Sequence, residues 1–128
     1  MVSLDSSFLI DLLLGKPAAI EKAADLDRRS EPRWISAPAA SEVLLGGYYV
    51  GGPYLERTRV LIDGLLLHPF DRVAYHEAGR IGAELARRGV PLGQADLFIA
   101  AIAIRHGQSL VARDAAFSRV PGLRVEPY

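Results

Sequence analysis

Short apolar segments alternate with longer segments of helical periodicity along the chain, and this alternation limits the possible folds more than any other feature. The first short segment, VSLD at residues 2–5, runs into a stretch whose Phe8, Leu9 and Leu12 recur at helical spacing. Parallel strands have this pattern because helical crossovers cover both faces of their sheet. We therefore predict a single three-layer α/β/α domain over residues 1–128 with a central, mainly parallel sheet. Strands are expected at residues 2–5, 34–37, 66–70, 109–112 and 123–127.

Proline, glycine and capping residues predict where the helices begin and end. Pro38 suits the first position of a helix, and Gly46-Gly47 are expected to end it, which makes GGYYVGGP at residues 46–53 a loop. We expect this loop to connect two helices, with one of its two tyrosine rings packed down. A mobile flap that stacks a base or grips a partner is the alternative. Asp71 is expected to cap a long helix that ends near residue 89.

The composition excludes several classes of protein. A chain of 128 residues with half of them hydrophobic and 23% charged is typical of a globular domain. The 15 basic and 15 acidic residues balance, which argues against a strongly basic surface for non-specific nucleic-acid binding. There is no cysteine, so disulfides and thiolate metal sites are excluded. The apolar start lacks the basic region of a signal peptide, and no apolar run approaches the ~20 residues of a membrane span, so we expect a soluble, cytoplasmic protein.

Several familiar active-site motifs are absent. The chain has no phosphate loop, no dinucleotide-binding glycine motif and no nucleophile elbow. His76-Glu77 could begin the zinc-binding motif of a metalloprotease, but that motif needs a second histidine at position 80, which is Arg80. His68, His76 and His106 are not spaced as metal ligands, and we expect them to be ordinary surface or helix-end residues.

Four carboxylates remain as candidates for a site, and each lies close to the end of a predicted strand or the start of a predicted helix. Asp5 ends the first strand, Asp114 follows a later strand, Asp96 precedes eight consecutive apolar residues of a predicted helix, and Glu42 lies one helical turn after a strand. Each alone is explained as a helix cap, a partner of the helix dipole or a solvent-facing acid. Together at the carboxyl edge of a parallel sheet, they would repel one another unless a cation lay among them. With no cysteine and no suitable histidine, the cation that fits is Mg²⁺ or Mn²⁺.

The chain also resembles a known family, the PIN domains, and more narrowly the VapC toxins of toxin–antitoxin pairs. The resemblance rests on VSLDSSFLIDLL at the start, on SAPAASEVLLG around Glu42, and above all on GVPLGQADLFIAAIAIRHG and LVARDAAFSRVPGLRV in the last third. It extends over almost the whole length in the same order and spacing. It implies a parallel sheet between helices.

By this resemblance, Asp5, Glu42, Asp96 and Asp114 form an acidic quartet that binds the metal, with Asp5 and Asp96 the surest ligands. Ser6 occupies the position of a hydroxyl that helps to order the metal site, although it would also suit a helix cap. The family cleaves RNA with metal-activated water and leaves 5′-phosphate and 3′-hydroxyl ends. It usually forms homodimers and is silenced by an antitoxin (VapB-like), whose C-terminal segment covers the active-site groove.

Two departures and two alternatives qualify this expectation. Many relatives have a hydroxyl where this chain has Ala112 and an extra acid where it has Ala116, which weakens the case for a firmly held second metal. A PIN-like module without activity, serving only as a binding partner, is therefore the main alternative. A response-receiver domain is disfavoured because it needs a lysine on a late strand, and no lysine lies beyond position 22. A haloacid-type phosphatase is disfavoured because it needs a second aspartate two places after the first, where this chain has Ser7.

Overall fold

Five strands form the central sheet of the computed structural model, which describes all 128 residues. In chain order they are β1 (Val2–Leu4), β2 (Arg33–Ser36), β3 (Leu66–His68), β4 (Ser109–Val111) and β5 (Val125–Glu126). Their spatial order is β3-β2-β1-β4-β5, and all four pairings are parallel. The predicted parallel sheet is confirmed, with strand ends within about two residues of those expected.

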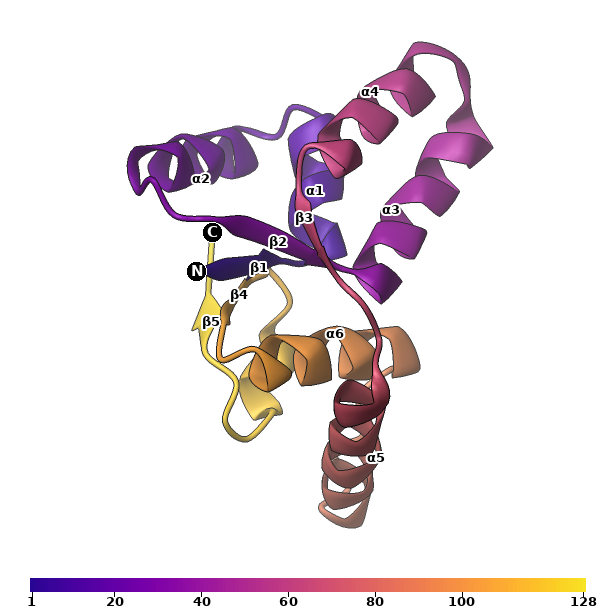
Figure 1. The fold of residues 1–128 in the computed structure, drawn as a ribbon, viewed down its shortest axis with the longest axis vertical. Helices are drawn as coiled ribbons and strands as arrows, with labels where there is room; N and C mark the ends of the chain where they lie inside the picture. The colour runs from indigo at the N-terminus through magenta and orange to yellow at the C-terminus, as the bar shows by residue number, and fades with distance from the viewer.

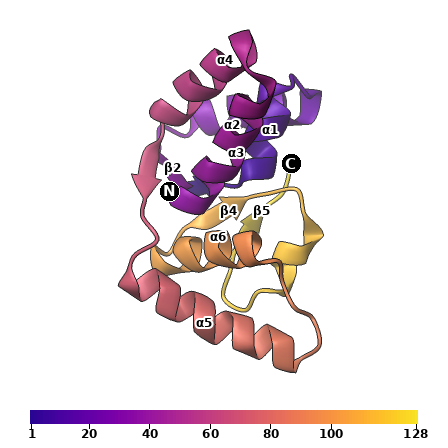
Figure 2. The same cartoon turned by 90° about the vertical axis from the view of Figure 1, so that its right-hand side faces the viewer.

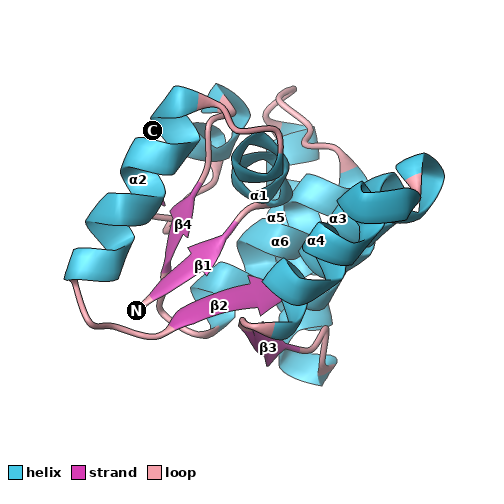
Figure 3. Cartoon of the chain, turned by 90° about the horizontal axis from the view of Figure 1, so that it is seen from above, coloured by secondary structure: helices cyan, strands magenta, loops and turns pink.

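Helices cover both faces of this sheet. They are α1 (Ser6–Leu13), α2 (Pro17–Arg28), α3 (Ala37–Val50), α4 (Gly52–Asp63), α5 (Arg72–Arg87), α6 (Gln94–Arg105) and the short 3₁₀ helix η1 (Ala115–Arg119). Figures 1 and 2 show α1 to α4 on one side of the sheet and α6 on the other, with α5 packed outside α6. Seen from above, α1 lies between α2 and the α3–α4 pair (Figure 3). None of the helices is both long and apolar enough to cross a bilayer.

The connection pattern reverses the direction of strand addition at β1. The chain leaves β1 toward β2 and β3 and then returns to the other side of β1 as β4. The carboxyl ends of β1 and β4 are therefore neighbours whose following segments diverge, which is where open parallel sheets bind ligands. The backbone N–H of Asp5 donates to the carbonyl of Val111 at 3.0 Å and holds these two ends together.

In α5 and α6, the helices on the face of the sheet opposite α1 to α4, the buried residues are those that the sequence periodicity predicts. Ala74, Ala78, Ile81 and Leu85 form the buried stripe of α5, and Asp71 caps this helix by accepting from the N–H of Ala74 at 2.9 Å. Helix α6 lies between α5 and the sheet, and all five residues from 99 to 103 are buried. Its apolar character on every side is therefore the consequence of contacts on two faces.

The predicted loop at residues 46–53 is wrong for most of its length. Helix α3 continues through both glycines to Val50, and the C-cap Gly51 adopts a positive φ of 73°. A Cβ on Gly47 would lie 3.0 Å from Cγ2 of the buried Thr58, so this glycine lets α3 and α4 pack closely. The rings of Tyr48 and Tyr49 are 64% and 87% exposed, and neither packs down as expected. The segment is a helix end, not a loop or flap.

The expectation that all three histidines are surface or helix-end residues is wrong for His68. Its ring is buried and stacks on Trp34 with centroids 4.0 Å apart and on His106 with centroids 3.6 Å apart. Burial lowers the pKa of both histidines, and their mutual proximity lowers that of His68 further. The stack joins β2, β3 and the end of α6.

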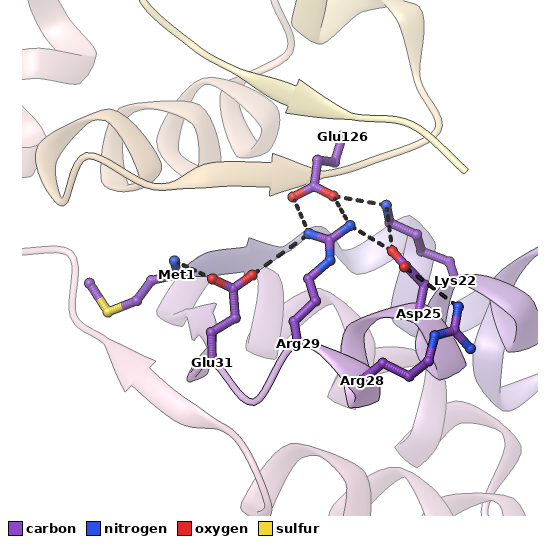
Figure 4. A network of polar contacts seen from close by, with 7 residues as sticks. All are labelled: Met1, Lys22, Asp25, Arg28, Arg29, Glu31 and Glu126. Atoms are coloured by element: carbon purple, nitrogen blue, oxygen red, sulfur yellow. Dashed lines mark hydrogen bonds and ion pairs between the residues drawn. The ribbon is translucent and has the colours of Figure 1, made fainter.

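An ion-pair network fixes the two chain ends against α2 (Figure 4). Glu126 of β5 accepts from Lys22 at 2.9 Å and from Arg29 at 3.0 Å, and Arg29 also contacts Asp25 and Glu31. The N-terminal ammonium donates to Glu31 at 2.8 Å. The hydrogen bond from Arg29, followed by that from Lys22, lowers the pKa of Glu126 to about 2.

Candidate metal and active site

A pocket of about 480 Å³ lies at the carboxyl ends of β1 and β4. It is the place that the strand order singles out, and four acidic side chains line it while the histidines lie elsewhere. Arg113 is its one basic side chain. The lining residues are Asp5, Ser6, Ser7, Ile10, Asp11, Asp96, Arg113, Asp114 and Phe117.

Asp5 is the most deeply buried of the predicted ligands, with 3% of its surface exposed. It caps α1, and its Oδ2 accepts from the Ser7 backbone N–H at 3.3 Å and from the Ser7 hydroxyl at 2.6 Å. Its Oδ1 is buried without any hydrogen-bond partner. Burial raises the pKa of Asp5, the bonds from Ser7 lower it, and the charge of Glu42 raises it. One oxygen of this carboxylate is thus fixed and the other is unsatisfied.

Asp96 lies in the first turn of α6, and the buried residues that follow anchor it from behind. Its side chain is half-buried at the pocket. Burial raises its pKa, and the charges of Asp5 and Asp114 raise it further. Asp96 is therefore close enough to Asp5 and Asp114, which come from two other segments, for their charges to act on it. The buried part of α6 fixes its first turn at the pocket wall, and this explains why a carboxylate, Asp96, precedes a run of apolar residues.

Asp114 lies at the exposed rim of the same pocket. Its Oδ1 accepts from the N–H of Ala116 at 2.8 Å and caps η1. The helix-cap explanation is correct for Asp114, and the same side chain also lines the pocket with Asp5 and Asp96. The two roles are compatible because one carboxylate oxygen makes the cap.

Glu42 does not line the pocket. It is half-buried on α3, where its Oε1 accepts a hydrogen bond from the Ser6 hydroxyl at 3.0 Å. Ser6 does line the pocket; it follows Asp5 in the chain and donates to Glu42. The suggestion that Ser6 caps α1 is wrong, since Asp5 is the N-cap.

Sequence reasoning missed a fourth acid in the pocket, Asp11. It is 3% exposed, and its carboxylate contacts three cationic or hydroxyl groups, those of Arg113 at 3.0 Å, Lys16 at 3.5 Å and Tyr128 at 2.7 Å. Its position in the sequence gives a usable signal, because Asp11 follows Ser7 by four residues and so shares its helix face. Burial, then the bond to Asp11, raises the pKa of Tyr128 to about 12.

The pocket suits a hard cation that keeps several of its waters better than a cation whose ligands all come from the protein. No three of the chain's Asp, Glu or His side chains converge closely enough to hold a metal ion between them. Mg²⁺ is commonly held by one or two carboxylates and keeps several waters, so such spacing is adequate for it. The unsatisfied Oδ1 of Asp5 and the repulsion of Asp96 by Asp5 and Asp114 are features that a cation would relieve. All candidate donors are oxygen atoms, as Mg²⁺ and Mn²⁺ prefer.

Comparison with known proteins gives consistent results. The family model described as "PIN domain" matches residues 2–123. The chain is similar to a protein of Shigella flexneri named tRNA(fMet)-specific endonuclease VapC, with 32% identity over 130 residues that cover 98% of this chain and 96% of the relative. A protein of the same name from Salmonella typhimurium is 30% identical over the same shares.

Solved structures have the same fold. DNA-bound VapBC from Salmonella typhimurium contains a chain with a TM-score of 0.81 and 30% identity, covering 99% of this chain and 98% of that one. VapBC2 from Rickettsia felis, bound to a DNA fragment from its promoter, contains one with a TM-score of 0.85 over 100% and 99% of the two chains. At 22% identity, the second likeness concerns the fold alone.

Proposed function

Because the chain belongs to the PIN domain family and, within it, to the VapC proteins, we propose that it is the endoribonuclease toxin of a toxin–antitoxin pair. It hydrolyses phosphodiester bonds of RNA with the help of Mg²⁺ or Mn²⁺. The observation that carries this proposal is the meeting of Asp5, Asp96 and Asp114 at one pocket, with an unpartnered buried oxygen on Asp5.

In this proposal Asp5 and Asp96 would bind the ion directly, and Asp114, which lines the same pocket, would add its negative charge to the site. When bound, a Mg²⁺ or Mn²⁺ ion supplies a water of lowered pKa as nucleophile and offsets the charge that develops on the leaving oxygen. Ser7 fixes one oxygen of Asp5 and leaves the other without a partner, so that this oxygen would be available to the ion. Helix α6 fixes Asp96 through its buried residues and brings the positive end of its dipole to the pocket.

We keep Glu42 and Ser6 in the proposed site with a distinct role. Ser6 donates to Glu42 and lies in the pocket wall, so it connects Glu42 to the pocket that contains the proposed ligands. The charge of Glu42 raises the pKa of Asp5, and this repulsion favours cation binding at Asp5. Glu42 thus acts through Ser6 from outside the pocket lining, while Asp5, Asp96 and Asp114 line the pocket itself.

We further propose that a VapB-like antitoxin and a second copy of the chain cover part of its surface. Leu45, Tyr48, Tyr49 and Val50 are all more than 60% exposed on α3, and Val60 is 67% exposed on the adjacent α4. Large apolar side chains gathered on neighbouring elements are typical of interaction surfaces. The similar chains of known structure occur in VapBC assemblies, which supports this assignment.

The test incubates the purified chain with RNA in the presence and absence of Mg²⁺ or Mn²⁺. The tRNA(fMet) species is the first substrate to try, because the two similar proteins are named for it. We expect cleavage that needs the ion and is lost in Asp96→Asn. The matched control is Asp71→Asn, which alters a helix-capping acid outside the pocket and retains a good capping residue. Cleavage at the parent's rate by Asp96→Asn would contradict the proposal.

A further inference from the structure

Asp11 and Arg113 form an ion pair in the pocket wall that the proposed hydrolysis does not use. We infer that Arg113 binds a phosphate of the RNA substrate and that Asp11 is the positioning residue that holds it there. The inference rests on the proposed function and adds to it the group that recognises the polyanion. It is based on the ion pair between the half-exposed guanidinium of Arg113 and the almost fully buried carboxylate of Asp11, which lie 3.0 Å apart.

Asp11 has the properties of an anchor and not those of a metal ligand. Only 5% of its side chain is exposed, and both of its oxygens have positively charged or hydroxyl partners. Arg113 and the Tyr128 hydroxyl contact Oδ2, and Lys16 lies 3.5 Å from Oδ1. In Asp5, by contrast, one oxygen has no partner at all. The negative charge of Asp11 is therefore offset within the protein.

The anchor itself is held in place from the far end of the chain. Tyr128 donates to Asp11 across 117 residues, and its ring packs edge-on against Phe8 with centroids 5.1 Å apart. Phe8 is fully buried in α1, three residues before Asp11. The carboxylate that meets Arg113 is consequently fixed by α1 and by the C-terminal residue together, which pre-organises the arginine.

Arg113 keeps most of its binding capacity free. Its side chain is 56% exposed, and the ion pair uses Nη1, while no other acceptor in the structure contacts its remaining nitrogens. A guanidinium has five N–H donors in a planar fork that matches phosphate. Arg113 is the only basic side chain lining a pocket that also contains Asp5, Asp96 and Asp114. A polyanion that approaches these acids needs such a positive contact, since the acids repel its phosphates.

The first test measures binding of a short single-stranded oligoribonucleotide at several salt concentrations. The Asp96→Asn background is used so that the probe remains intact. We expect Arg113→Ala to weaken binding about tenfold. It should also reduce the slope of log affinity against log salt by about 0.7, the value for one phosphate contact to a single strand. Arg113→Lys should restore the slope. The matched control is Arg80→Ala, an exposed arginine paired to Glu77 outside the pocket, which should change neither quantity.

The second test distinguishes positioning from general structural support. In the cleaving protein, Asp11→Asn should raise KM several-fold with little change in kcat, because it loosens Arg113 and leaves the metal ligands in place. In the Arg113→Ala background, the same change at Asp11 should have no further effect on KM. A loss in kcat, or an equal added loss of affinity in the double variant, would overturn the positioning role of Asp11.

The outcomes separate this inference from the proposed function. If Arg113→Ala leaves the salt slope unchanged, or the parent binds no RNA, the inference about Arg113 fails. If the parent binds RNA through Arg113 but never cleaves it with any divalent ion, the proposed hydrolysis fails and the phosphate contact stands. In that case the chain is a PIN-like binding module.

Discussion

The Ser6 hydroxyl donates a hydrogen bond to Oε1 of Glu42 at 3.0 Å, and this bond joins two segments that lie 36 residues apart in the chain. Ser6 belongs to the pocket wall, whereas Glu42 lies behind it on α3. The bond makes the position of an acid on one helix depend on the first residue of another. Its removal therefore isolates the contribution of this acid to the pocket.

Ser6→Ala is expected to reduce RNA cleavage while leaving the fold intact. The change removes the donor to Glu42 but not the cap of α1, which Asp5 provides. The free energy of unfolding should fall by about 1 kcal/mol, as is usual for one hydrogen bond. Cleavage rate and urea unfolding are measured in parallel. Full activity in a variant of lowered stability would show that the bond is structural only.

Glu126→Gln tests the ion-pair network at the chain ends. The folded-state pKa of Glu126 is lowered to about 2, below the ordinary 4.5, so its stabilising effect is present above pH 4.5 and is lost as the pH falls toward 2. We expect Glu126→Gln to cost about 1 kcal/mol at pH 7. The difference between parent and variant should shrink below pH 4.5. Urea titrations at pH 7, 4 and 3 measure it, and a difference independent of pH would contradict this account.

The stacked histidines predict that stability also depends on pH in a second, less acidic range. Both His68 and His106 have pKa values lowered below 6.5 by burial, so the unfolded chain takes up protons that the folded chain does not. Stability should therefore decrease as the pH falls below 6.5. His106→Phe keeps an aromatic partner for His68 and removes one titrating group. Its urea midpoint should change less between pH 7.5 and 5.5 than that of the parent, and equal changes would exclude the stack as the cause.

Two adjacent glycines of α3 should respond in opposite directions. A Cβ added at Gly46 would meet no other atom within 4 Å, so Gly46→Ala should stabilise the helix by about 0.5–1 kcal/mol. At Gly47 the added atoms would meet Thr58 at 3.0 Å, and Gly47→Val should destabilise the protein by about 1–3 kcal/mol. Thermal unfolding of both variants provides the comparison. Stabilisation by Gly47→Val would mean that α3 and α4 are not closely packed.

Asp5 and Asp114 could be found from the sequence because parallel-sheet topology brings strand ends together, and Asp96 because it precedes a long apolar helix. Asp5, Asp96 and Asp114 needed only the order of strands and helices, and they do line one pocket. The partnership of Ser6 with Glu42 and the three contacts of Asp11 could not be found in this way. They depend on side-chain directions between segments far apart in the sequence, which periodicity does not contain.

The path of α3 shows a different limit of sequence reasoning. Paired glycines ordinarily end a helix, but Gly47 is retained inside α3 because its missing side chain makes room for Thr58. The close packing of α3 with α4 outweighs the low helix propensity of glycine. Likewise, His68 becomes buried because Trp34 and His106 cover its two faces. Such tertiary contacts override local preference.

The central claim is that the carboxylates of Asp5 and Asp96, from two separate segments, bind one divalent cation at the pocket, and direct titration of the protein with Mn²⁺ tests it without any substrate. Binding is followed by electron paramagnetic resonance or calorimetry for the parent, for Asp5→Asn and Asp96→Asn, and for the control Asp71→Asn. The predicted result is a Mn²⁺ site in the parent and in the control that is lost or greatly weakened in both pocket variants. Equal Mn²⁺ binding by all four proteins would contradict the claim.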